Sequence, residues 1–148
     1  MNEQQSDLIT STLPKYLIDA YRMAQYRVGN PFGITLTVGE QSQELLEHFS
    51  AHQIDSAGFI TAFNPLGRSL QDEENTALHK SLLAEIDRRN LSFIEGEGAD
   101  PANIHPAETS ALIFGLSLEG ACDIGNIYEQ NAIIWIGPDA IPRLVLLR

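Results

Sequence analysis

The stretch GFITAFNPLGR, residues 58–68, joins an apolar segment directly to a turn. Residues 58–63 are apolar on both alternating faces, which is typical of a central strand covered on two sides. Residues 64–68 combine an Asn–Pro pair with a glycine and predict a tight turn. A helix follows to about residue 89, with Ser69 as its expected N-cap, acidic residues in its first turn and arginines in its last. A strand, a turn and a helix in succession favour an α/β fold.

Hydrophobic periodicity on either side of this unit predicts the remaining elements. Further helices are expected near residues 13–26, 43–52 and 119–128, and further strands near 33–38, 92–95, 110–116, 132–136 and 143–147. The predicted order is αβαβαββαββ. This order favours one α/β domain over residues 1–148, built on a mixed sheet of five or six strands with helices packed on it. Residues 1–30 are expected to form a helix and a turn that pack on this domain.

Composition restricts the class of protein. The 148 residues carry 20 acidic and 9 basic side chains, a formal net charge of -11. This excess of acid disfavours nucleic acid as a partner, and no apolar segment is long enough to span a membrane. Residues 1–7, MNEQQSD, lack the basic and apolar regions of a secretory signal, so we expect a cytoplasmic location. The same acidity permits an alternative function, binding of a basic protein partner.

The loop between the buried strand and the following helix is the best candidate for a binding site. Free N–H groups at a helix start favour an anion, Gly67 permits close approach to the backbone, and Arg68 can bind a carboxylate or phosphate. Asn64 can hold either the turn or a ligand. In the alternative interpretation these residues only shape the turn, and Arg68 pairs with the acidic residues 72–74. The loop matches neither a Walker motif nor a dinucleotide-binding fingerprint.

Two titratable side chains are candidates for proton transfer. Asn75 and His79 are four residues apart on the predicted helix, so both can face the loop. His79 is the first candidate acid or base and Glu108 the second, although a partly exposed surface histidine is the more common case. Tyr16, Tyr21 and Tyr26, along the first predicted helix, are expected to be packing residues.

Other polar groups carry weaker predictions. Gln130 and Asn131 precede an apolar strand, where two amides can either cap the backbone or contact a ligand. The acidic segment 95–98 is interpreted as a solvated turn rather than an Mg²⁺ or Ca²⁺ site. His48 and His52 lack the glutamate of a zinc-protease helix. We therefore expect neither a metal nor a cofactor.

Several of these segments together resemble a family of small bacterial proteins, the domain of unknown function 3293. An Asn–Pro–x–Gly turn, a later asparagine and a Gln–Asn–Ala run recur together in that family. The residues at these places are Asn64, Pro65, Gly67, Asn75, Gln130, Asn131 and Ala132. The resemblance implies a shared polar site and brings no activity with it.

The sequence therefore favours a cytoplasmic α/β protein that binds a small, anionic ligand at the strand-to-helix loop. The expected contacts come from Asn64, Pro65, Gly67, Arg68 and Asn75. Gln130 and Asn131 form the opposite wall if their strand lies beside the 58–63 strand. Whether the site is catalytic stays open. The alternative is a non-enzymatic interaction or inhibitor protein whose acidic surface binds a basic protein.

Overall fold

A computed structural model describes residues 11–102 and 104–148. The MNEQQSD segment and the first part of the 1–30 region lie outside the described residues. The helices are α2 (Lys15–Met23), α3 (Gln43–His52), the 3-10 turn η1 (Pro65–Gly67), α4 (Asp72–Arg88) and α5 (Leu118–Ile127). The strands are β1 (Gln25–Val28), β2 (Thr35–Leu36), β3 (Ala57–Thr61), β4 (Phe93–Ala99), β5 (Glu108–Phe114), β6 (Ala132–Ile136) and β7 (Pro142–Leu146).

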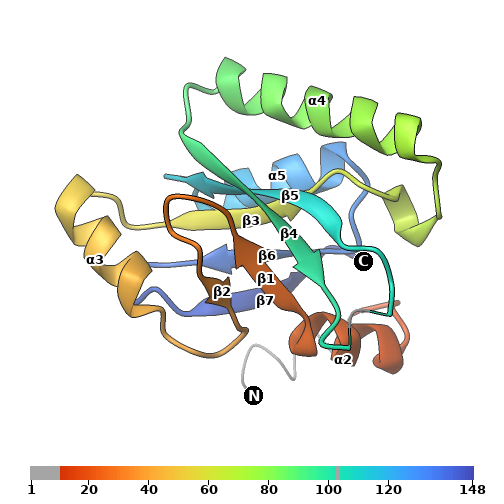
Figure 1. Ribbon diagram of the computed structural model, residues 1–148, viewed down its shortest axis with the longest axis horizontal. Coiled ribbons are helices and arrows are strands. Elements are labelled where there is room, and N and C mark those ends of the chain that lie inside the picture. Colours follow the sequence, from red (N-terminus) through yellow and green to blue (C-terminus); the bar gives the residue numbers. More distant parts are fainter. Residues whose placement is uncertain (1–10, 103) are drawn as a thin grey trace.

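The described strands form one sheet of seven in the order β2-β1-β4-β5-β3-β6-β7 (Figure 1). Every neighbouring pair is antiparallel. The α/β class is confirmed, but the predicted mixed sheet of five or six strands and the order αβαβαββαββ are wrong. The extra strand is β1, where we expected the end of a helix and a turn. The helix ends at Met23, and Tyr26 and Val28 then alternate with less buried residues, as a strand requires.

The sheet is antiparallel throughout because each helical crossover skips one strand position, and an antiparallel strand fills that position. The unit β3–α4–β4–β5–α5–β6 has the strand order β4-β5-β3-β6, which is the split βαβ arrangement. β3 and β4 run in the same direction with β5 between them, and β5 and β6 run in the same direction with β3 between them. Helices and strands alternate along the chain, yet no two parallel strands become neighbours.

β3 is a buried interior strand of the sheet, with a neighbouring strand on each side, as predicted. Phe59 packs in a core on one face and Ile60 in a core on the other. The core around Ile60 lies beneath α4 and α5 and includes Leu82 and Ile124. Apolar side chains on both faces of β3 therefore reflect two separate cores rather than one.

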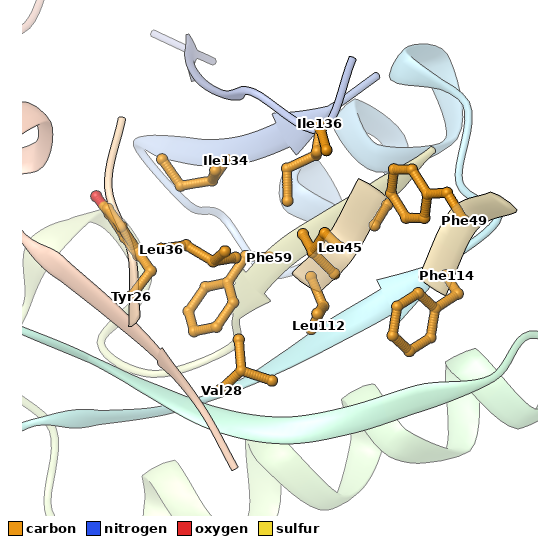
Figure 2. Close-up of a cluster of buried hydrophobic side chains, with 12 residues drawn as sticks. Tyr26, Val28, Leu36, Leu45, Phe49, Phe59, Leu112, Phe114, Ile134 and Ile136 are labelled. Carbon is orange, nitrogen blue, oxygen red and sulfur yellow. The ribbon is translucent and has the colours of Figure 1, made fainter. Parts of the chain in front are cut away.

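The core around Phe59 fills the concave side of the curled sheet (Figure 2). Side chains from β1, β2, α3, β3, β5 and β6 converge there, and Leu45 and Phe49 bring in the buried face of α3. The ends of the strand order approach each other across this core. The Gly39 N–H donates to the Pro142 carbonyl at 2.9 Å, and the Ser42 N–H donates to the Ala140 carbonyl at 2.9 Å. The curl therefore brings the chain that follows β2 against the start of β7.

Helix α4 starts two residues later than expected. Its N-cap is Gln71 rather than Ser69, and the Glu74 side chain accepts a hydrogen bond from the Gln71 N–H. The preceding residues stay extended because the Asn64 side chain accepts from the Leu70 N–H at 3.0 Å. Among residues 11–102 and 104–148, no helix combines the length and the apolar composition that a membrane span requires.

Candidate functional site

A pocket opens where β3 ends, between the first residues of β5, the segment before β6, and α2. Its empty volume, including the solvent at its mouth, is about 610 Å³. The aromatic side chains in its lining are Tyr21, Tyr26, Phe59 and Phe63. The polar side chains in its lining are Thr61, Asn64, Glu108, Ser110, Gln130 and Asn131. The lining therefore combines four aromatic side chains, called the aromatic wall below, with six polar side chains, called the polar wall, and the two sets meet where Asn131 contacts Tyr21.

The turn after β3 is held by a reciprocal pair of asparagines. The Asn64 N–H donates to Asn75 Oδ1 at 2.9 Å, and Asn75 Nδ2 donates to Asn64 Oδ1 at 2.9 Å. Asn64 has a φ of 51° and a ψ of 59°, the left-handed region that asparagine tolerates better than most residues. Only 5% of Asn75 is exposed. A buried amide on α4 thus fixes the conformation of a residue in the pocket lining.

The same asparagine orients the carboxyl group of Glu108. Asn64 Nδ2 donates to Glu108 Oε2 at 2.7 Å. Burial raises the pKa of Glu108, and the hydrogen bond from Asn64 opposes this rise. Burial also raises the pKa of Tyr21, and the negative charge of Glu108 adds to that effect. A carboxyl group with a raised pKa in an open pocket is suited to holding a ligand proton or to transferring one.

Gln130 and Asn131 line the pocket beside the turn rather than opposite it, because the Leu66 N–H donates to the Glu129 carbonyl at 2.7 Å. Their strand, β6, pairs with β3, which is the condition that the sequence left open. Gln130 Nε2 donates to the Phe63 carbonyl at 3.0 Å and to the Tyr128 carbonyl at 3.2 Å. Asn131 Nδ2 donates to the Tyr21 hydroxyl at 3.2 Å. Tertiary structure therefore brings the turn and this amide pair to the same pocket.

Four of the remaining sequence candidates lie at its edge or outside it. Gly67 lines the pocket with a φ of 73°, whereas Pro65 is buried beneath the turn. Arg68 is exposed, lies outside the pocket lining, and donates from Nε to the Pro65 carbonyl at 3.1 Å. Asn75 lies beneath the pocket, where it contacts Asn64 rather than the pocket interior. The structure thus separates the predicted set into lining residues and supporting residues.

His79 is neither exposed nor in the pocket lining. Only 8% of the residue is exposed, so the expectation of a partly exposed surface histidine is wrong. It lies one helical turn beyond Asn75 on the buried face of α4. Its Nε2 is 3.6 Å from Glu95 Oε2, and its ring makes an edge contact with Phe63. Of the two proton-transfer candidates, only Glu108 reaches the pocket.

Sequence reasoning missed the aromatic wall. Tyr21 and Tyr26 were expected only to pack, yet both line the pocket, and the Tyr26 hydroxyl donates to the Tyr21 carbonyl. Tyr16, by contrast, is 75% exposed, so its assignment as a packing residue is wrong. The alternation of polar and apolar residues in QYRV, residues 25–28, is the sequence signal that could have placed Tyr26 in a strand. The position of Tyr21 depends on the fold of α2 against β6, which no local pattern gives.

The acidic segment 95–98 is part of strand β4 and not the solvated turn that we expected. Gly96 makes this possible, because a Cβ atom there would lie 2.2 Å from the Arg27 carbonyl oxygen of β1. Glu97 pairs with Arg27 at 3.2 Å across the same strands. Within the described residues, no group of three or more His, Cys, Asp and Glu side chains could hold a metal ion.

Residues 60–133, half of the chain, match the model of a family described as a protein of unknown function, DUF3293. The chain belongs to this family. The DUF3293 region begins in β3 and ends in β6, so it contains the 64–67 turn, Glu108 and both wall amides. Tyr21 and Tyr26 lie outside it, on the elements that precede it. No curated protein and no solved structure matches the chain.

Proposed function

We propose that this DUF3293 protein binds a small molecule in the pocket lined by the 64–67 turn, Glu108 and residues 130–131. The observation that carries the proposal is the Glu108 carboxyl group, which Asn64 orients at the polar wall of an open pocket. Partial burial of a carboxyl group and two asparagines costs free energy, so such a network is more informative than exposed polar residues. Binding of a ligand would account for an arrangement that packing alone does not require.

The roles of the sequence candidates follow from their places. Asn64, Gln130 and Asn131 would line the ligand, and Gly67 would permit its close approach to the backbone. Asn75 would act as a positioning residue, because it holds Asn64. Arg68, on which the expectation of an anionic ligand depended, lies outside the lining. We therefore leave the charge of the ligand out of this proposal and argue it separately below.

A fragment screen by protein-observed NMR tests the proposal. The ¹⁵N-labelled full chain provides side-chain amide signals from Asn64, Gln130 and Asn131, which line the pocket. We expect fragments to shift these signals together. We further expect Gly98→Phe to remove the shifts, because Gly98 pairs with Glu108 across β4 and β5 and lines the pocket, so a phenylalanine side chain there fills it. Fragment shifts that gather elsewhere, or that survive in a folded Gly98→Phe variant, would refute the proposal.

The alternative, a basic protein partner, rests on the net charge of -11. Such binding should weaken strongly as salt is added, because exposed charges are screened within about 8–10 Å at physiological ionic strength. It should also be indifferent to Gly98→Phe, which changes no charge. A pocket ligand should show the opposite pattern, a loss of binding in Gly98→Phe. The two functions are therefore separated by one variant and a salt titration.

A further inference from the structure

We propose that the ligand is a compact organic cation, a primary ammonium group on a short apolar body. The ammonium group would bind Glu108, and the apolar body would pack against Tyr21, Tyr26, Phe59 and Phe63. This inference rests on the proposed function and adds the chemical class of the ligand. Charge, hydrogen bonding and the aromatic wall support it independently.

The charge of the pocket is the first argument. Among the described residues that line it, Glu108 is the only charged one, and the lining contains neither lysine nor arginine nor histidine. The negative charge of Glu108 also reaches the hydroxyl groups of Tyr21 and Tyr26, whose pKa values are raised by burial first and by this charge in addition. An anion would meet this carboxylate without a compensating cation. An ammonium group would form a charge-assisted hydrogen bond with it.

Hydrogen-bond donors in the lining are already largely used. The hydroxyl groups of Thr61 and Ser110 donate to backbone carbonyls at 2.8 and 2.9 Å. Gln130 Nε2 donates to two backbone carbonyls, and Asn64 Nδ2 donates to the Glu108 carboxyl group. Within the described residues, Glu108 Oε1 has no hydrogen-bond partner. Donors do remain, because the Tyr21 hydroxyl and the second amide hydrogens of Asn64 and Asn131 have no acceptor among the described residues. The one charged group of the lining is an acceptor, which suits a ligand that donates several hydrogen bonds, as an ammonium group does.

The aromatic wall supplies the third argument. Tyr26 and Phe59 contact edge to face, with ring centroids 5.4 Å apart, and both line the pocket with Tyr21 and Phe63. Aromatic faces attract cations and also bury apolar groups. A ligand with an ammonium group next to an apolar body can bind the Glu108 carboxylate and pack against the aromatic side chains at the same time. A fully polar cation, such as a metal ion, would leave the aromatic wall unused.

Three small compounds of nearly equal shape test the charge preference. Benzylamine, benzyl alcohol and benzoate are titrated into the ¹⁵N-labelled full chain at neutral pH, and the amide signals of Asn64, Gln130 and Asn131 are followed. We expect benzylamine to bind about 10-fold more tightly than benzyl alcohol, since hydrogen bonds to charged groups exceed neutral ones by about this factor. We expect benzoate to bind most weakly of the three.

Two isosteric variants control the experiment. Glu108→Gln keeps an oxygen that can accept from Asn64 but removes the charge, so the preference for benzylamine over benzyl alcohol should disappear. Glu119→Gln removes a carboxylate from the exposed first turn of α5 and should leave the preference unchanged.

The outcomes separate the two proposals. If benzyl alcohol or benzoate binds at these amides as tightly as benzylamine, the proposal of a cationic ligand is refuted. The proposal that the pocket binds a small molecule is not affected by that result. An amine preference that persists in Glu108→Gln would do the same. If the fragment screen also leaves these amides unshifted, both proposals fail.

Discussion

Replacement of Asn75 by alanine tests the idea that a buried helix residue holds the pocket turn. The change removes the acceptor of the Asn64 N–H and one of the two donors to Asn64 Oδ1. Asn64 Oδ1 keeps its hydrogen bond from the Leu70 N–H. The Asn64 N–H is therefore the one group left without a partner. An unsatisfied buried group costs about 1–3 kcal/mol, and the higher helix propensity of alanine returns roughly 0.5 kcal/mol. We expect a net loss of about 1.5 kcal/mol in the free energy of unfolding.

Urea unfolding at pH 7 measures this loss, and the corresponding decrease in Tm is about 3–6 °C for a chain of this size. Asn126→Ala is the matched control, because Asn126 is exposed on α5 and its loss should change stability by less than about 0.5 kcal/mol. A second readout is the pKa of Glu108, which should rise further when Asn64 no longer holds its carboxyl group. Equal stabilities for Asn75→Ala and Asn126→Ala would refute the reasoning.

Three further changes test other parts of the structure. Burial raises the pKa of Glu108 above the ordinary value of 4.5, so its contribution to stability is present below that value and is lost as pH rises through the folded pKa. Glu108→Gln should therefore gain stability relative to the natural chain across this window in urea unfolding between pH 4 and 8, and a constant difference would contradict the shift. Gly96→Ala should cost about 3 kcal/mol in urea unfolding, because its Cβ meets the Arg27 carbonyl at 2.2 Å, whereas Gly98→Ala, with nearest atoms at 3.9 Å, should cost less than about 1 kcal/mol. Equal effects at the two glycines would mean that β1 and β4 separate readily. Ser42→Ala removes the N-cap that accepts from the Leu45 N–H, and thermal unfolding should show a loss of about 1 kcal/mol, with no change refuting the cap.

Local patterns predicted the elements whose residues carry their own signal. The apolar run at 58–63 indicated a central strand, and β3 is buried on both faces. The β6–β7 hairpin and helix α3 were also predicted, because turn residues and a 3.6-residue period mark them locally. β1 was not, since its four residues follow a helix without a strong breaker, and they form a strand by pairing with β2 on one side and β4 on the other.

The candidate site was likewise predicted only in part from local sequence. An Asn–Pro turn and a later pair of amides could be singled out from the chain, and the family match covers both. The sequence could not show that Asn75 supports Asn64 from below or that Arg68 stays outside the pocket. Those facts depend on which face of α4 packs on the sheet and on where the 3-10 turn directs its side chains.

The sequence by itself determined the α/β class, the buried strand and the polar segments, because hydrophobic period and turn chemistry act over a few neighbouring residues. Only the tertiary structure decided the all-antiparallel order and the composition of the pocket. Tyr21, Asn64, Glu108 and Asn131 are far apart in the chain and meet because β3 lies between β5 and β6 while α2 covers its end. Strand order reflects the burial of two cores at once, which is a property of the whole chain and not of any segment.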